Sequence, residues 1–99
     1  MHLNNEFYAI RQWAKDKGIL DKGDAKTQFV KLLEEVGELS HGILKDDKAE
    51  IEDAIGDIVV VLTSIAHLSD LKIEDCINSA YSVISKRTGK MVDGNFVKD

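Results

Sequence analysis

Residues 48–68 constrain the fold more than any other segment of this chain. Apolar residues recur there without a proline or a turn signal, and they occupy most of the circumference of a helix. The β-branched run 58–62 could instead form a buried strand, but the apolar pattern continues to Leu68, which favours a helix. A helix that is apolar nearly all round has to be buried nearly all round, and a chain of 99 residues can hardly achieve this alone. We therefore expect an all-α bundle completed by oligomerisation, as a homodimer or a homotetramer.

Three further helices follow from apolar periodicity and from residues that favour helix ends. They are predicted over residues 5–17, 25–44 and 73–87, the first ending before Gly18 and the last before Gly89. Asp24 is a suitable N-cap for the second of these helices. Asp47 and Glu50 have the spacing of a capping box in front of residues 48–68. Residues 18–24 are expected to form a polar loop.

The tail of the chain carries the signature of a β-hairpin. The pair Asp93-Gly94 lies there between two short apolar runs, as in a tight turn between paired strands. The chain contains no proline, no repeat and no linker, so residues 1–99 form one domain. The expected fold is a four-helix bundle with a short hairpin-like tail.

The composition excludes several classes of function. The formal net charge is −5 and the basic residues are scattered, which argues against nucleic-acid binding. The longest purely apolar run, residues 58–62, is too short to span a bilayer, and the N-terminus lacks the pattern of a signal peptide. The single cysteine, Cys76, excludes an intrachain disulfide and fits a reducing compartment. We therefore expect a cytoplasmic protein that binds neither nucleic acid nor membranes.

Carboxylates gather at two places along the predicted helices. Glu34, Glu35 and Glu38 share one arc of the helix that precedes the short connection. Asp53 and Asp57 lie four residues apart and share one face of the helix that follows it. Helices joined by a short connection are usually antiparallel neighbours, so the two acidic faces are expected to meet. Converging carboxylates repel one another, and the simplest compensation is a hard divalent cation such as Mg²⁺ or Mn²⁺.

Each acidic group also has a simpler explanation. The first cluster alone could form a solvated helix face, and Glu50 is better explained by the capping box. Asp57 is different, because Ile55 and residues 58–62 leave it little solvated surface. We therefore favour a metal site. The alternative is a non-catalytic interaction module whose acidic face binds a partner or a structural cation.

The acidic residues stand in two motifs that carry a family resemblance. The segments are Leu33-Glu34-Glu35-Val36-Gly37-Glu38-Leu39 and Asp53-Ala54-Ile55-Gly56-Asp57. They resemble the all-α nucleotide pyrophosphohydrolases of the MazG type, and the spacing is similar to that of small phage-type MazG-like proteins. The family signature is Glu-Glu-x-x-Glu followed by Glu-x-x-Asp. The second motif departs from it, because Ala54 stands at the glutamate position and Asp53 lies one residue earlier. The segment Glu50-Ile51-Glu52-Asp53 is an alternative in-frame match, and we favour Asp53 and Asp57.

The resemblance implies hydrolysis of a nucleoside triphosphate, above all a dNTP, to monophosphate and pyrophosphate by water attack at the α-phosphorus. It implies Mg²⁺, or Mn²⁺ as a substitute, held by Glu35, Glu38, Asp53 and Asp57. Glu34 would bind a second metal ion or act as the base that orients water, so Glu34, Glu35 and Glu38 are the expected catalytic residues. A phosphoribosyl-ATP pyrophosphohydrolase resembles the same superfamily and is the alternative enzyme.

Basic and aromatic residues are candidates for binding the substrate. Lys31 lies one turn before the first motif, and Lys86, Arg87 and Lys90 cluster near the end of the last helix. Such cations would neutralise the leaving pyrophosphate, although basic residues also favour a helix C-terminus for electrostatic reasons. Trp13 would stack on the base, with core packing as the simpler alternative.

Overall fold

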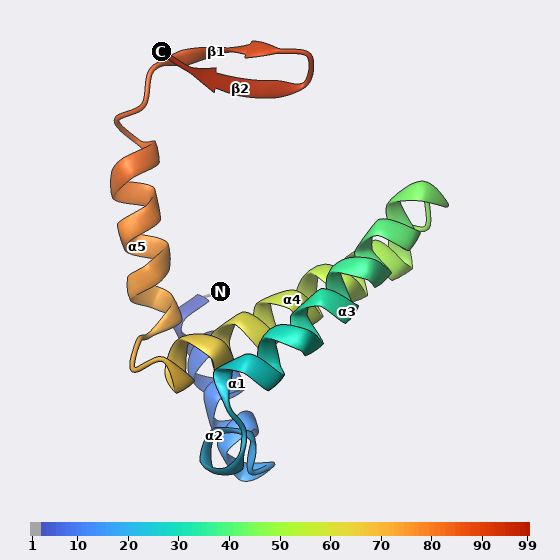
Figure 1. Ribbon diagram of the computed structural model, residues 1–99. Coiled ribbons are helices and arrows are strands. Elements are labelled where there is room, and N and C mark those ends of the chain that lie inside the picture. The colour runs from blue at the N-terminus through green and yellow to red at the C-terminus, as the bar shows by residue number, and fades with distance from the viewer. Residues whose placement is uncertain (1–2) are drawn as a thin grey trace.

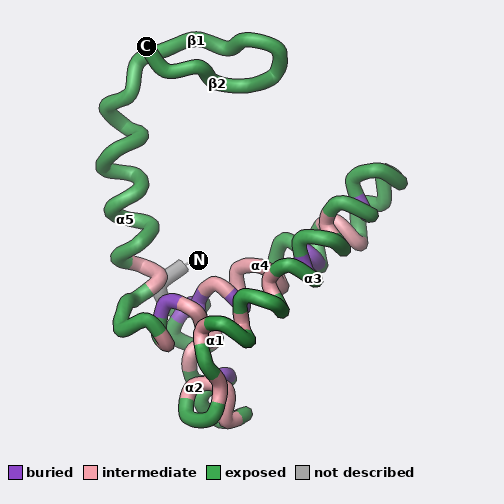
Figure 2. The backbone as a smooth tube through the Cα atoms, in the orientation of Figure 1, coloured by how far each residue is buried: buried purple, intermediate pink, exposed green. Residues whose placement is uncertain are grey.

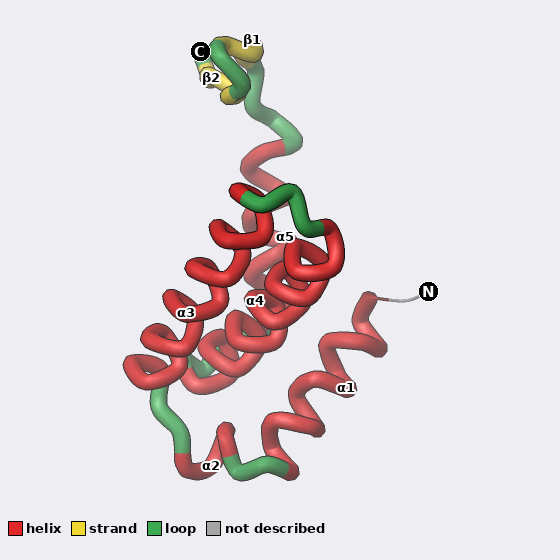
Figure 3. The backbone as a smooth tube through the Cα atoms, turned by 90° about the vertical axis from the view of Figure 1, so that its right-hand side faces the viewer, coloured by secondary structure: helices red, strands yellow, loops and turns green. Residues whose placement is uncertain are grey.

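The computed structural model describes residues 3–99 and confirms the all-α prediction (Figure 1). The described residues form α1 (Leu3–Asp16), α2 (Ile19–Lys22), α3 (Ala25–Leu44), α4 (Lys48–Leu68), α5 (Ile73–Ile84), β1 (Gly89–Val92) and β2 (Asn95–Lys98). Helices α3 and α4 lie antiparallel along their length, and α1 packs across α4 (Figure 3). We call α1 to α4 the body. We call α5 and the hairpin, residues 73–98, the arm.

The ends of α3 and α4 follow from side-chain caps and from a tight connection. Asp24 accepts a hydrogen bond from the backbone N–H of Thr27 at 2.8 Å, and Asp47 accepts one from Glu50 at 3.2 Å. Both predicted N-caps are therefore confirmed. α3 ends in a Schellman motif in which Asp46 adopts the left-handed conformation, with φ of 54°. This turn folds α4 straight back along α3.

Gly42 lets α3 and α4 approach each other closely near the connection. Gly42 is buried, and a Cβ atom on it would lie 3.2 Å from the backbone nitrogen of Ile51. At the same end of the pair, Nδ1 of His41 lies 2.7 Å from a carboxylate oxygen of Glu50. The predicted capping box is thus half formed, because the Glu50 side chain contacts His41 instead of returning to Asp47.

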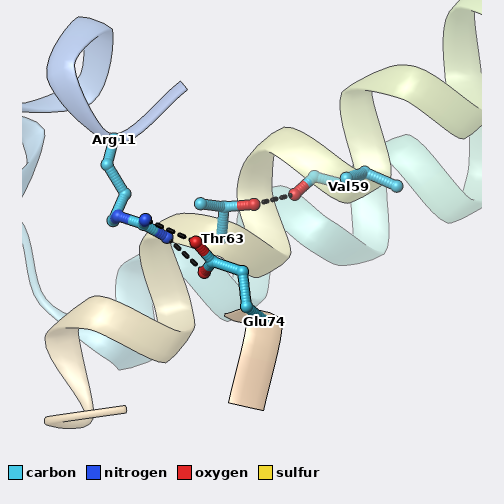
Figure 4. A network of polar contacts seen from close by, with 4 residues as sticks. All are labelled: Arg11, Val59, Thr63 and Glu74. Atoms are coloured by element: carbon cyan, nitrogen blue, oxygen red, sulfur yellow. Dashed lines mark hydrogen bonds and ion pairs between the residues drawn. The ribbon is translucent and has the colours of Figure 1, made fainter. Parts of the chain in front are cut away.

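The core is small and lies mainly along α4, where α1 and α3 pack against it (Figure 2). Its buried apolar residues are Phe7, Ala14, Ala54, Val61 and Ala66. Thr63 is buried with them, and its hydroxyl donates a 2.7 Å hydrogen bond to the Val59 carbonyl of the preceding turn (Figure 4). The buried hydroxyl is therefore satisfied within its own helix.

A partly buried ion pair fixes the base of the arm to the body. Arg11 of α1 donates hydrogen bonds of 2.5 and 2.6 Å to the two carboxylate oxygens of Glu74 in α5 (Figure 4). These hydrogen bonds lower the pKa of Glu74 below its ordinary value. α4 ends in a second Schellman motif, with Asp70 at φ of 60°, and α5 leaves at 102° to α4.

The hairpin in the tail confirms the turn prediction. β1 and β2 pair antiparallel, and Asp93 and Gly94 have φ angles of 49° and 83°. Two consecutive positive φ angles are the property of a type I′ turn. Gly89 lies inside the pairing, where a Cβ atom would collide with the Phe96 ring and the Val97 carbonyl.

Some boundaries differ from the sequence predictions. The segment 18–24 contains the short helix α2 in place of a polar loop, and the first helix covers Leu3–Asp16. The last helix ends at Ile84, before the predicted limit at residue 87, and Gly89 is a strand residue. The reason is that Thr88 already pairs with Asp99, through its hydroxyl at 2.7 Å and its carbonyl at 3.0 Å. The chain must therefore leave the helix earlier than its local periodicity indicates.

The arm stands apart from the rest of the chain. Every residue from 75 to 99 is exposed, including the apolar side chains of Ile77, Tyr81 and Ile84 (Figure 2). Among the described residues, α5 contacts α1 and α4 only, and it does not lie along α3. No single helix within residues 3–99 has the length and apolar content needed to cross a membrane, and α4 and α5 reach that threshold only when joined across their bend.

Candidate metal centre

Three carboxylates converge between α3 and α4. Glu35 and Glu38 lie one turn apart on α3, and Asp57 reaches them from α4, so that one oxygen of each lies within 4.8 Å of the others. The antiparallel register that places Gly42 against Ile51 also brings Glu35 level with Asp57. The helix pair therefore brings together three of the four carboxylates predicted to hold a metal ion.

Glu35 is the buried member of this group, with 5% of its surface exposed. One of its oxygens, Oε1, lies 3.3 Å from Nζ of Lys31 in the preceding turn. The other, Oε2, is buried and has no hydrogen-bond partner among the described residues. Leaving a carboxylate oxygen buried without a partner is costly, so one position of the cluster lacks a compensating group.

The pKa values of the cluster reflect this crowding. Burial raises the pKa of Asp57 above its ordinary value, and the charges of Asp53 and Glu35 raise it further. The charge of Glu35 raises the pKa of Glu38. Lys31 responds in the opposite sense: its hydrogen bond to Glu35 raises the lysine pKa and stabilises the charged ammonium. The cluster thus holds more negative charge than Lys31 compensates.

The donor set fits a divalent cation of the Mg²⁺ or Mn²⁺ type. All three groups offer carboxylate oxygen, which such hard cations prefer. The buried Oε2 of Glu35 has no hydrogen-bond partner within residues 3–99 and so offers a lone pair to a cation. Pairing of Asp57 with a basic side chain is the alternative. Within residues 3–99, no lysine or arginine lies within 4.0 Å of its carboxylate oxygens.

A cleft of about 670 Å³ adjoins the carboxylates. This volume is in the range of pockets that bind small molecules. Its apolar wall includes Trp13, Ile19, Val30 and Val60, and its polar wall includes Lys31, Glu34, Glu35 and Asp57. Trp13 is about half exposed, with 48% of its surface accessible, so its ring is available to a ligand in the cleft. The predicted residues Trp13, Lys31 and Glu34 therefore share one cavity with the cluster.

Asp53, the fourth predicted metal ligand, lies outside the three-residue cluster. It is exposed one turn before Asp57 and lines a neighbouring hollow of about 650 Å³, to which Asp57 also contributes. The one-turn separation on α4 keeps the two aspartates on the same face. Asp53 therefore acts on the cluster through its charge, which raises the pKa of Asp57.

The remaining predicted residues are not near the cluster of their own chain. Lys86 and Arg87 lie in the turn between α5 and β1, and Lys90 lies in β1, all on the arm (Figure 1). Helix α3, which carries Glu35 and Glu38, makes no contact with α5 or the hairpin in the described part of the chain. These three cations and the carboxylates do not meet within one chain.

Several residues of the cleft were not predicted from the sequence. Ile19 of α2 lines it, together with Thr27 and Gln28 from the first turn of α3 and with Ser64 of α4. The adjacent apolar pair Ile19-Leu20 was a usable signal, because two apolar residues are unexpected in a solvated loop. Thr27, Gln28 and Ser64 carried no such signal, since polar residues on a helix are expected to face water.

Comparisons with known proteins agree with the acidic motifs. The sequence profile of the MazG nucleotide pyrophosphohydrolase domain matches residues 24–92, which include α3, α4, α5 and β1. The chain is also similar to an uncharacterised 18.2 kDa protein in the rep-hol intergenic region of Haemophilus phage HP1 (strain HP1c1), with 42% identity over 57 residues. That alignment covers 58% of this chain and 35% of the phage protein, so the chain matches about a third of that relative's length. No solved structure matches the chain.

Proposed function

The chain belongs to the MazG nucleotide pyrophosphohydrolase domain family, and we propose that it hydrolyses nucleoside triphosphates, dNTPs in particular, to monophosphate and pyrophosphate. In this reaction water adds to the α-phosphorus and the bond from that phosphorus to the bridging oxygen of pyrophosphate breaks. The proposal places the enzyme in the cytoplasm as a homo-oligomer that uses Mg²⁺, with Mn²⁺ as a substitute.

One observation carries the proposal: the buried Oε2 of Glu35 has no hydrogen-bond partner in the described part of the chain, and it lies in a carboxylate cluster beside a cleft of nucleotide size. Glu35, Glu38 and Asp57 would hold the divalent cation, with Asp53 adding negative charge from the next turn. When bound, the cation polarises phosphoryl oxygens and offsets the electrostatic repulsion between the polyanionic substrate and the acidic site.

Two side chains in the cleft are suited to handle the phosphates and the attacking water. Lys31 has 52% of its side chain exposed, so its ammonium group can turn from Glu35 to a phosphate oxygen and neutralise the leaving pyrophosphate. Glu34 has 63% of its side chain exposed on the cleft wall. Its carboxylate can accept a proton from water, the role of a general base.

The apolar wall of the cleft is suited to the base of the nucleotide. Trp13 offers a large flat surface for stacking. Ile19 and Val60 complete an apolar lining whose side chains form no hydrogen bonds with a base. Such a wall binds a base with little discrimination, while Thr27 and Gln28 supply the polar groups that could read it. Lys86, Arg87 and Lys90 enter the proposal only through another subunit, because they lie on the arm.

The test is release of pyrophosphate and monophosphate from all eight common NTPs and dNTPs, and from phosphoribosyl-ATP, with Mg²⁺, with Mn²⁺ and with EDTA. We expect metal-dependent release of both products from dNTPs, and none with EDTA. Release of inorganic phosphate in place of pyrophosphate would refute attack at the α-phosphorus. Silence of a folded protein across the whole panel would favour the non-catalytic interaction module.

A further inference from the structure

The cleft between α3 and α4 has two polar ends of different chemistry. Glu35 and Asp57 lie level with each other at the carboxylate end. Two turns farther along both helices, the antiparallel register sets Gln28 of α3 level with Ser64 of α4, and both line the cleft (Figure 3). Thr27 lies beside them, and we call these three residues the neutral end. It lies about 10.5 Å from the carboxylates, the length of seven helical residues between Asp57 and Ser64.

Ser64 is the most deeply buried residue of the neutral end. Only 2% of its surface is exposed, and the residue lines the cleft. The neighbouring Thr63 is equally buried, but its hydroxyl donates to the Val59 carbonyl (Figure 4). The hydroxyl of Ser64 has no hydrogen-bond partner within residues 3–99. Its side chain is therefore polar at a place where the protein itself supplies no partner.

The fold alone does not account for a serine at this position. A buried hydroxyl without a partner is costly. Alanine is almost the same size and is the better helix former, so it would satisfy the packing of α4 at lower cost. A ligand in the cleft that hydrogen-bonds to the hydroxyl would remove the cost and give the serine a role.

The wall between the two ends is apolar and limits the class of ligand. Val30 of α3 and the pair Val60-Val61 of α4 lie between the ends, and Trp13 also lines this wall. A ligand that spans the cleft therefore needs an anionic group, a flat apolar body and a hydrogen-bonding edge, in this order. A nucleoside phosphate has all three, and its length from the phosphorus to the far edge of the base is comparable to the distance between the two ends.

We propose that Ser64 is a specificity-determining residue, whose hydroxyl hydrogen-bonds together with the Gln28 amide to the edge of a base stacked on Trp13. Both groups donate and accept hydrogen bonds, so they match a neighbouring donor and acceptor on a base edge. Burial holds the Ser64 hydroxyl in place, and a fixed polar group discriminates against a base that leaves it unpaired. This assignment deepens the proposed function and rests on it for the class of ligand.

Thermal unfolding without ligand or metal tests whether the hydroxyl serves the fold. Ser64→Ala should leave the melting temperature unchanged or raise it, because no group of the protein loses a partner. A marked decrease would show that the hydroxyl stabilises the folded chain, and it would overturn the assignment.

Trp13 allows base binding to be measured without turnover, because it is the only tryptophan of the chain. The probes are the four common deoxynucleoside monophosphates, titrated with Mg²⁺ while tryptophan fluorescence is recorded. We expect saturable quenching with dissociation constants that differ among the bases. Ser64→Ala should reduce the ratio between the weakest and the tightest constant by about tenfold, the effect of losing one hydrogen bond.

Thr63→Val is the matched control for these titrations. It removes a buried hydroxyl from the next position of α4, but that hydroxyl is paired within the helix and does not line the cleft. Thr63→Val should therefore keep the base preference of the wild type. If Ser64→Ala also keeps that preference, or if no monophosphate quenches Trp13, the assignment is wrong.

Pyrophosphate release from the four dNTPs shows whether the same preference governs turnover. Ser64→Ala should raise KM for the preferred dNTP by about tenfold and leave kcat nearly unchanged, because the hydroxyl lies two turns from the carboxylates. A fall in kcat that is equal for all four dNTPs would assign Ser64 a structural role at the carboxylates and overturn its role in specificity. An inactive wild type whose Trp13 fluorescence still distinguishes the monophosphates would refute the proposed function and support the reading of the base.

Discussion

The body and the arm obey the same local rules, but the buried core of the described residues lies in the body alone. In the body, Asp24 and Asp47 cap their helices, Gly42 admits the neighbouring helix and Lys31 pairs with Glu35. In the arm, α5 and a type I′ hairpin are equally regular, yet residues 75–99 remain exposed. Local sequence is therefore sufficient to build the helices and strands of both regions, whereas burial also requires a neighbouring surface, which residues 75–99 do not have within the described chain.

The largest effect should come from breaking the carboxylate cluster of the body. Asp57→Asn preserves size and removes one of the charges that crowd the centre. We expect pyrophosphate release to fall by roughly 100- to 1,000-fold, by analogy with the loss of one electrostatic group from other active sites. Without metal, the melting temperature should rise, because burial and neighbouring charge disfavour the ionised carboxylate in the folded state.

Thermal unfolding with EDTA and with Mg²⁺ checks the predicted change in the melting temperature. Mg²⁺ should raise the melting temperature of the wild type and raise that of Asp57→Asn less, since a bound ion stabilises only the state that holds it. Asp46→Asn is the matched control, because it removes a charge at the helix connection, away from the cluster. Equal stabilisation of all three proteins by Mg²⁺ would mean that the ion binds elsewhere.

The second-largest effect should come from the close packing of α3 against α4 in the body. Gly42→Val should destabilise the body by about 2–3 kcal/mol, because its side chain has to enter the space occupied by Ile51. Gly37→Ala is the matched control on the same helix. A Cβ atom at Gly37 meets nothing within 4 Å, so this change should stabilise by about 0.5–1 kcal/mol through helix propensity. Urea unfolding measures the free energy of unfolding of both variants. An unchanged value for Gly42→Val would show that α3 and α4 can move apart without loss of stability.

The ion pair between the two regions should have a smaller effect. Arg11→Met leaves Glu74 partly buried without its partner, at a cost of about 1–2 kcal/mol at neutral pH. The pKa of Glu74 is lowered in the folded protein, so the contribution of the pair is complete above the ordinary value of 4.5 and is lost as pH falls through the lowered value. Unfolding at several pH values should therefore show the two proteins converging in acid. A difference independent of pH would assign the role of Arg11 to packing.

The smallest effect should be confined to the arm. Gly94→Ala places a side chain at φ of 83° and should weaken the hairpin by about 0.5–1 kcal/mol. Amide hydrogen exchange should then quicken in β1 and β2 and stay unchanged in α3 and α4, because the hairpin makes no contact with the body among the described residues. Faster exchange in both regions would show that they unfold together.

Much of the local structure was predictable, because its causes are local in sequence. Asp24 and Asp47 fix where α3 and α4 begin, and Asp93-Gly94 fixes the turn of the hairpin. The end of α5 was not predictable in this way, since it depends on the pairing of Thr88 with Asp99. Nor was the 102° bend, because a left-handed aspartate, Asp70, ends α4 where glycine is the usual signal.

The candidate site also has a part that could be predicted from the sequence and a part that could not. The convergence of Glu35, Glu38 and Asp57 follows from spacing within two helices and a short connection, so sequence was sufficient to predict it. The apolar wall was not, since Ile19 and Val60 reach the cleft only through the packing of α2 and α4. The position of Lys86 and Arg87 away from the carboxylates could not be predicted from apolar periodicity, because it depends on the direction in which α5 leaves the body.

The three-residue connection between α3 and α4 also affects how readily the centre forms. It joins the carriers of all three carboxylates through a short loop, so little chain entropy opposes their encounter. The entropic cost is lower than that of the contact between Arg11 of α1 and Glu74 of α5, which joins residues 63 positions apart. Pairing of α3 with α4 therefore brings the carboxylates together at little entropic cost, and their mutual repulsion opposes this pairing. A divalent cation held by these carboxylates would offset the repulsion, and it would then stabilise the folded subunit as well as serve the proposed chemistry.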